Sequence, residues 1–223
     1  MDNNDRNQYQ VIRKDARGCF VESKSDSFPI GKIHMEFAAY DINKPAGQRF
    51  TNHVHIYIDA AEFVSLAHFI LYGNCHPRMA AIKKEGGTAN SPLFQSLGGT
   101  SAERLQQYGR ERKDGMSQSR SIALFVGSKA DYLLCAESGP GQTDAKGLIV
   151  PKYGGKPEQR VAVSMSWSNL NELMLITQAH YEAWLAGWYA RNYRAPDRSY
   201  GNSNGNTDGK EIGNDDADDT QMY

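Results

Sequence analysis

Rings and histidines alternate with branched apolar residues along two stretches in the first half of the chain. Side chains at every second position of a β-strand share one face, so rings spaced in this way gather on one surface. Aromatic faces stack on nucleobases, and positive charges beside them neutralise phosphates. This is the chemistry of contact with single-stranded nucleic acid. The candidate residues on segments 31–40 and 49–58 are His34, Tyr40, His53, His55 and Tyr57.

The second half of the chain offers fewer rings and more cations. Phe125 or Tyr132 would supply the ring there. Basic side chains fall near the ends of the expected strands, at Lys129, Lys146, Lys152 and Arg160. Each of these residues taken alone is also consistent with an ordinary solvent-exposed residue on the surface of a sheet. The combination of rings and cations favours stacking on bases together with release of phosphate counterions.

The histidines also raise the question of a metal site, because His34, His53 and His55 can share one sheet face. No fourth ligand stands at a diagnostic spacing, and Cys75-His76 is isolated. The sequence contains no GxxxxGK[ST] loop, no GxSxG elbow and no HExxH motif. We therefore expect no metal, no other cofactor and no enzymatic activity.

Two strand–helix pairs would position these residues. Residues 159–165 alternate as a half-buried strand and lead directly into a helix over residues 166–193, which Ser166 or Ser168 can cap. Residues 49–58 likewise lead into a helix over residues 59–73, with Asp59 as the expected N-cap. The repeated order indicates an internal duplication.

The remaining segments complete the pattern. Residues 1–73 predict a ββββα unit with strands at 9–13, 19–23, 31–40 and 49–58. Residues 121–195 predict a second unit with strands at 121–126, 130–137, 145–152 and 159–165. Between them, 74–120 reads as a basic, glycine-rich connector with one short helix near residues 101–108, and 196–223 reads as a disordered tail. The expected fold class is α+β, with tandem ββββα units forming one compact domain and a helix covering each antiparallel sheet.

The charge distribution and the cysteine content indicate the kind of cellular compartment to expect. The formal net charge of the 223 residues is −1, but residues 200–223 carry a net −5 and the rest a net +4. The three cysteines, Cys19, Cys75 and Cys135, are too few and too far apart for a disulfide framework or a CxxC zinc site. With no apolar run of membrane-spanning length and no secretory signal, we expect a cytoplasmic protein without membrane contact.

Several short motifs resemble a known family. Gly139-Pro140-Gly141, Lys146-Gly147-Leu148-Ile149 and the helix opening Trp167-Ser168-Asn169-Leu170 are similar to a run found in Whirly proteins, and a single unit resembles transcriptional positive cofactor four. The resemblance covers about two thirds of the chain. It implies a Whirly-like fold that binds single-stranded DNA. The chain departs from that pattern in its longer connector and in lacking a lysine-glycine segment in the first half.

The end of the chain carries a separate resemblance. A run of acids closes on two apolar residues, as in bacterial single-stranded-DNA-binding proteins, although those usually end in proline-phenylalanine. That resemblance implies a tip that docks on replication or repair proteins. The residues concerned are Asp215, Asp216, Asp218, Asp219, Met222 and Tyr223.

The leading hypothesis is a sequence-independent single-stranded-DNA-binding protein, capable of self-association, that protects single strands in replication, repair or mobile-element transfer. One alternative is a transcriptional regulator or RNA-binding module on the same fold. A second is an oligomerisation protein with no nucleic-acid ligand.

Overall fold

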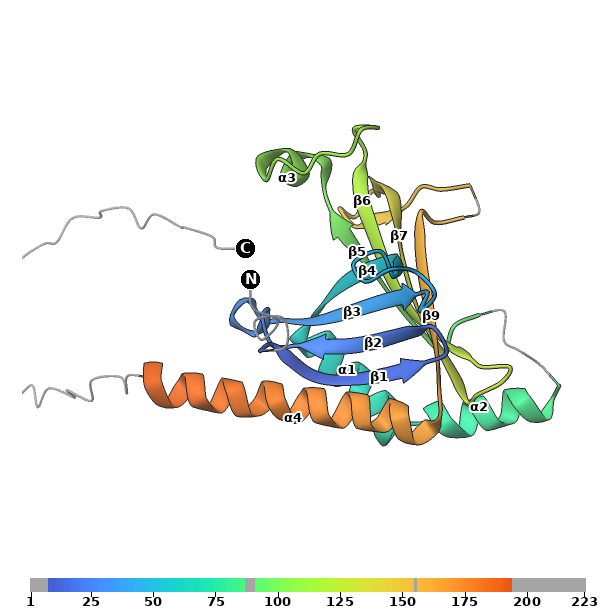
Figure 1. The fold of residues 1–223 in the computed structure, drawn as a ribbon. Helices are drawn as coiled ribbons and strands as arrows, with labels where there is room; N and C mark the ends of the chain where they lie inside the picture. Colours follow the sequence, from blue (N-terminus) through green and yellow to red (C-terminus); the bar gives the residue numbers. More distant parts are fainter. Residues whose placement is uncertain (1–7, 87–90, 155, 194–223) are drawn as a thin grey trace, which may run out of the picture.

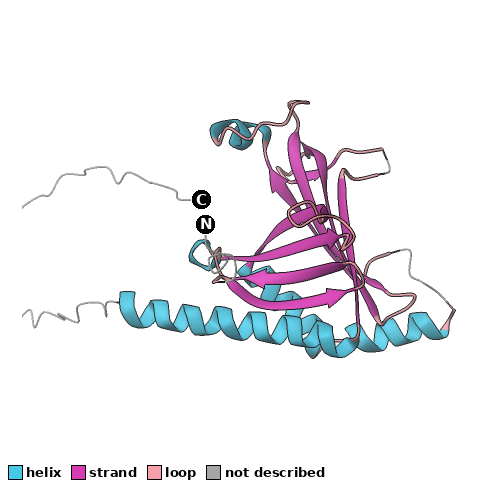
Figure 2. Ribbon diagram, viewed as in Figure 1, coloured by secondary structure: helices cyan, strands magenta, loops and turns pink. Residues whose placement is uncertain are grey.

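The computed structural model describes residues 8–86, 91–154 and 156–193, which form two antiparallel sheets and a long C-terminal helix (Figures 1 and 2). Sheet A has the order β1-β2-β3-β4. Sheet B has the order β5-β6-β7-β8, and β9 also pairs with β7. This arrangement confirms an α+β fold built on antiparallel sheets. The strands are β1 (Gln10–Ala16), β2 (Cys19–Lys24), β3 (Lys32–Tyr40), β4 (Phe50–Asp59), β5 (Phe94–Thr100), β6 (Ser117–Val126), β7 (Tyr132–Thr143), β8 (Ile149–Pro151) and β9 (Gln159–Met165). The helices are the 3-10 turn η1 (Phe28–Ile30), α1 (Ala60–Leu71), α2 (Cys75–Lys84), α3 (Ala102–Gln107) and α4 (Trp167–Asn192).

Sheet A and α1 match the first expected ββββα unit. The alternation in β3 and β4 sends Ile33, Met35 and Phe37 to one face with Val54 and Ile56, all of them buried. The cap of α1 differs from the expectation. Asp59 stands at the N-cap position but makes no side-chain cap bond. Its carboxylate instead accepts a hydrogen bond from Lys32 Nζ at 2.6 Å, across the β3–β4 pair.

Sheet B is larger than expected, because the segment between the units is not an element-poor connector. It contains α2, β5 and α3, and all of β5 pairs with β6. Gly98 and Gly99, which indicate a loop in the sequence, lie within strand β5. A Cβ on Gly99 would stand 2.2 Å from the Gln118 carbonyl oxygen, and the Ile149 side chain lies over both Gly99 and Gly141. The expected loop at 138–141 likewise lies inside β7.

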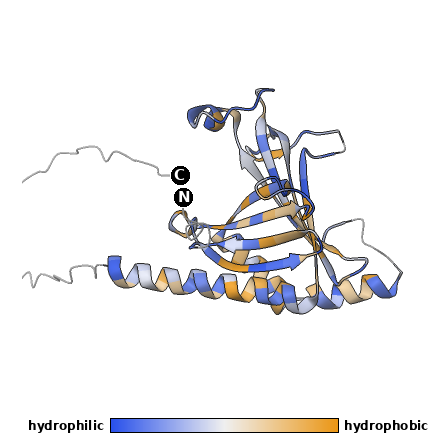
Figure 3. Ribbon diagram, viewed as in Figure 1, coloured by the Kyte–Doolittle hydropathy of each residue, from blue (hydrophilic) through white to orange (hydrophobic). Residues whose placement is uncertain are grey.

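Helix α4 does not cover its own sheet, which corrects the expectation of one helix per sheet. Ser166 caps it, accepting a hydrogen bond from Asn169 N at 3.2 Å. The helix then runs along sheet A and α1. Lys14 of β1 forms an ion pair with Glu172, and the Ser23 and Thr177 hydroxyls are 2.6 Å apart. The hydrophobic residues of α4 are concentrated where it passes sheet A (Figure 3).

One hydrophobic core joins both sheets with α1 and α4. The inner face of sheet A, the β6–β7–β9 part of sheet B and buried residues of both helices form a single cluster. The two halves are therefore not separate cores. All the helices that contact sheet A through this core lie on one side of it, which leaves the other face of the sheet for rings and ionisable residues. Within the described residues, no helix is long and apolar enough to cross a membrane.

The packing of α4 predicts a sharp contrast between two neighbouring leucines. Leu173 is fully buried, whereas Leu175 is 45% exposed on the same helix. Leu173→Ala should lower the free energy of unfolding by about 2–5 kcal/mol, because it leaves a cavity between α4 and sheet A. The matched change Leu175→Ala should cost only about 0.5 kcal/mol. Urea unfolding measures both, and equal losses would contradict the observed orientation of α4.

Candidate nucleic-acid interface

The outward face of sheet A collects the rings expected from the first half of the chain. In the β3–β4 register, His34 pairs with Tyr57 and Glu36 with His55. The His34 and Tyr57 rings stack with centroids 4.5 Å apart, and the His53 and His55 rings lie 4.3 Å apart. Tyr57 keeps 46% of its surface exposed. All five residues predicted here, including Tyr40, come together on one face, but His34 is only 4% exposed and stacks against the Tyr57 ring rather than facing solvent.

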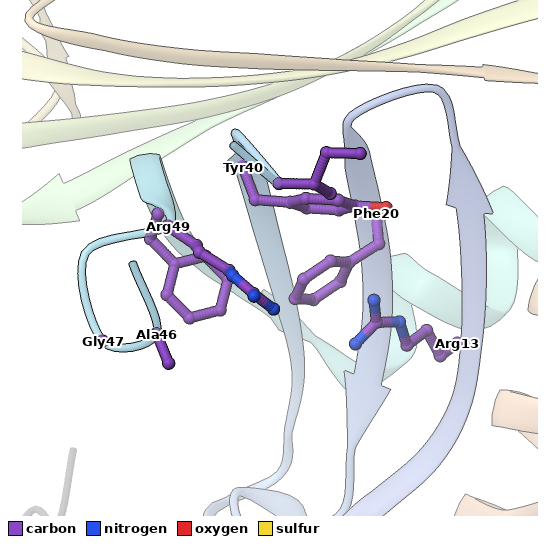
Figure 4. A pocket seen from close by; sticks show the side chains of 8 residues that line it. Arg13, Phe20, Tyr40, Ala46, Gly47 and Arg49 are labelled. Atoms are coloured by element: carbon purple, nitrogen blue, oxygen red, sulfur yellow. The ribbon is translucent and has the colours of Figure 1, made fainter. Parts of the chain in front are cut away.

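At one end of this face, three rings and two arginines surround a pocket of about 300 Å³. The Arg13 guanidinium lies 3.6 Å from the centroid of the Phe20 ring, and Phe20 contacts Tyr40 and Phe50 (Figure 4). We call this the aromatic pocket; its ring and cation residues are Arg13, Phe20, Tyr40, Arg49 and Phe50. Flat rings beside guanidinium groups suit a stacked base with its phosphate.

At the other end, a groove of about 880 Å³ lies between sheet A, β5, the start of β6 and the segment around α3. Cations outnumber the two acids, Asp59 and Glu62, that also line it. Arg120 is held in place by donating a hydrogen bond from Nη1 to Thr100 Oγ1 at 2.9 Å. We call this the basic groove; its ring and cation residues are Lys32, His55, Tyr57, Arg104, Tyr108, Arg110 and Arg120.

Strand β4 connects the two sites. Phe50 lines the aromatic pocket, His55 and Tyr57 line the basic groove, and His53 stacks on Phe50 with centroids 5.7 Å apart. Seven residue steps in a strand cover about 23 Å. Burial raises the pKa of the Tyr57 phenol, so the ring stays neutral at physiological pH. The result is a continuous row of rings with positive charge at both ends.

Beneath the rings lies a hydrogen-bonded network of ionisable groups. His34 Nδ1 lies 2.9 Å from Asp26 Oδ2, and His34 Nε2 lies 2.9 Å from His55 Nδ1. Glu36 contacts His53 Nε2 at 2.6 Å and also forms an ion pair with Lys24. Burial would raise the pKa of Glu36, but the hydrogen bonds from His53 and Lys24 outweigh it and lower the pKa to about 2. Burial and the neighbouring His53 lower the pKa of His55 to about 4.

The second-half candidates are scattered rather than gathered. Tyr132 is fully buried, with its hydroxyl 3.2 Å from His76 Nδ1 and its ring near Trp167, so its expected role as a stacking platform is wrong. Its strand turns Tyr132, Leu134 and Ala136 together into the core. Phe125 is half-buried on the opposite face of sheet B from the core.

The predicted cations of sheet B stand on four different segments. Lys129 is exposed in the β6–β7 turn, and Lys152 is exposed just after β8. Lys146 is exposed next to Gly147, which lines the basic groove. Arg160 pairs with Glu137 at 3.4 Å. The tail candidates lie outside the described residues.

Sequence reasoning missed the arginines and three of the rings that complete the interface, Phe20, Phe50 and Tyr108. Arg104, Arg110 and Arg120 fell in the segment treated as a basic connector, and its surplus of positive charge was the available signal. Phe50 begins the same alternating segment as His53. Glu36 stands two residues after His34, and its importance depends on the register with β4.

No family model matches this chain, and the searches of curated proteins and of solved structures found no significant match.

The low pKa of Glu36 predicts how stability depends on pH. Because the folded-state pKa, about 2, lies below the ordinary 4.5, ionised Glu36 stabilises the fold above pH 4.5. That contribution should disappear as the pH falls from about 5 to 2. Glu36→Gln should cost on the order of 1–3 kcal/mol at neutral pH and should remove this part of the acid loss. Urea midpoints measured between pH 2 and 7 provide the test.

Glu22 supplies the control. Burial and the nearby Glu36 raise the pKa of Glu22, so its protonation on acidification favours the folded state. Glu22→Gln should therefore keep the acid loss or steepen it. If Glu36→Gln retained the acid loss of the unmodified protein in full, Glu36 would not be ionised and bonded as described.

Proposed function

We propose that this protein binds single-stranded DNA without sequence preference, and protects it during replication, repair or mobile-element transfer. The observation that carries the proposal is the row of rings along β4, from Phe50 to Tyr57, with guanidinium groups at both ends. Rings stack on any base, because every base has a π-face, and arginines follow the phosphates whatever the sequence. A Whirly-like architecture with an open sheet face is the finer form of the same proposal.

The exposed rings on this face explain why a flexible single strand suits it better than a duplex. Exposed rings contact bases only when those bases are unstacked and accessible, as they are in a single strand. The rings here lie on an open sheet surface and not on a helix or ribbon projecting into a major groove. The basic groove then supplies the electrostatic part of the affinity, which falls with added salt.

Fluorescence anisotropy with labelled oligo(dT), over a series of salt concentrations, tests the stacking part. Tyr57→Ala should weaken binding by about 1–3 kcal/mol, roughly 5- to 150-fold, through loss of one stacking platform. Tyr72→Ala is the control, because Tyr72 is also a tyrosine and is more exposed than Tyr57, but it stands at the end of α1. Equal affinity for the two variants would place the DNA on another surface.

The same assay tests the charged part. Arg110→Ala should weaken binding to every sequence and should flatten the dependence of affinity on salt. Lys84→Ala, which removes an exposed charge at the end of α2, should leave both unchanged. Tighter binding to duplex DNA or to RNA than to oligo(dT) would favour the alternative of a regulator or RNA-binding module.

The acidic end of the chain extends the proposal. Five net negative charges on residues 200–223 would compete with DNA for the basic body, most strongly at low salt. Deleting these residues should tighten single-strand binding at low ionic strength and change little at high ionic strength. The deletion should also abolish recruitment of any replication or repair protein that recognises Met222, Tyr223 and the terminal carboxylate. Weaker DNA binding after the deletion would instead make the tail part of the DNA site.

A further inference from the structure

Three potential metal ligands converge on the outward face of sheet A, beneath the exposed rings. His34 and Glu36 come from β3 and His55 from β4, and their ligand atoms all lie within 4.8 Å of one another. The register explains the convergence. Glu36 is directly opposite His55, and His34 is the diagonal neighbour of His55. His34 is 4% exposed and Glu36 8% exposed. A cluster with two buried ligands and a half-buried third, His55, differs from the exposed acidic groups common on protein surfaces.

The orientation of His34 is the second observation that points to a metal. The Asp26 carboxylate lies 2.9 Å from His34 Nδ1, which makes Nδ1 the protonated nitrogen and aims the Nε2 lone pair at the cluster. Histidines that bind metals almost always donate the other ring N–H to a carboxylate or carbonyl in this way. The carboxylate fixes the tautomer and raises the basicity of the nitrogen that faces the ion.

The spacing needs little adjustment. His34 Nε2 and His55 Nδ1 are 2.9 Å apart. Two nitrogens bound tetrahedrally at about 2.0–2.1 Å from an ion stand about 3.3 Å apart, so a small rotation of either ring suffices. A cation bound here would replace the hydrogen bond between the two nitrogens.

The charges around the cluster can accommodate a cation. Lys24 contacts Glu36, but it also lies 3.3 Å from Glu22, which can keep the ammonium when Glu36 turns to an ion. His53 Nε2, 2.6 Å from Glu36 Oε1, orients the carboxylate from the more open side. Acids and bases facing the cluster are therefore Glu22, Lys24, Asp26 and His53.

We propose that His34, Glu36 and His55 bind one divalent transition-metal ion of the zinc type. Two imidazoles and one carboxylate suit zinc and its late first-row neighbours, whereas calcium and magnesium prefer oxygen ligands. Three protein ligands leave a coordination position for water or for a ligand oxygen. The site goes beyond the proposed DNA binding, and its test requires no nucleic acid.

Isothermal titration of the chelator-stripped, full-length protein with Zn²⁺ tests the proposal. We expect one ion per chain in the unmodified protein and in the control His68→Gln, which removes an exposed histidine of α1. Glu36→Gln and His55→Gln should each bind at least tenfold more weakly. No binding by the unmodified protein, or equal affinity in all four proteins, would overturn the proposal.

Two further measurements separate lost ligands from lost folding. Asp26→Asn keeps all three ligands and changes only the group behind His34, so it should weaken Zn²⁺ binding about 10- to 100-fold while the thermal unfolding of the stripped protein stays close to normal. Co²⁺ should give the visible absorption of a four-coordinate nitrogen–oxygen site in the unmodified protein. A six-coordinate Co²⁺ spectrum, or unchanged affinity in Asp26→Asn, would contradict the proposed geometry.

Discussion

The antiparallel pairing of β3 with β4 is the constraint on which the core and the interface both depend. Because side chains alternate between faces, this one register buries Ile33, Met35 and Phe37 and turns His34 and Glu36 outward. A slip of one residue would exchange the two faces, placing ionisable groups in the core. The free energy of burying the apolar face therefore also fixes the spacing of the rings, the carboxylate and the imidazoles.

The course of α4 explains why this outward face stays open. If α4 had packed on sheet B, only α1 would cover sheet A. Apolar residues on the inner face of sheet A would then be exposed. Instead α4 passes under sheet A beside α1, so that both helices occupy the inner side. At one end of the outer side, β5, the α3 segment and the start of β6 form a border, which brings Arg104, Arg110 and Arg120 to the edge of the rings. The proposed DNA path needs that combination of an open sheet and a basic border.

Sequence patterns predicted the elements whose periodicity is strong. The strands at 31–40 and 49–58 and the helix after Ser166 follow from alternation and capping, and all are present. Strand β5 escaped prediction because Gly98 and Gly99 look like a loop until Ile149 is packed over Gly99. The orientation of β7 could not be read from a short, mostly apolar run, in which Tyr132 and Leu133 are equally plausible inward residues. Contacts such as Glu36 with His53 depend on register between strands, which a single sequence does not specify.

Locating bound DNA on the surface tests whether single strands follow β4. Ultraviolet cross-linking of the full chain to oligo(dT), followed by mass spectrometry of the cross-linked peptides, reports which rings contact bases. Binding along β4 should give cross-links at Phe50, His53, Tyr57 and Tyr108, which lie along β4 and in the basic groove. Cross-links confined to Phe125 on sheet B, or to the exposed Trp188 and Tyr189 of α4, would contradict it.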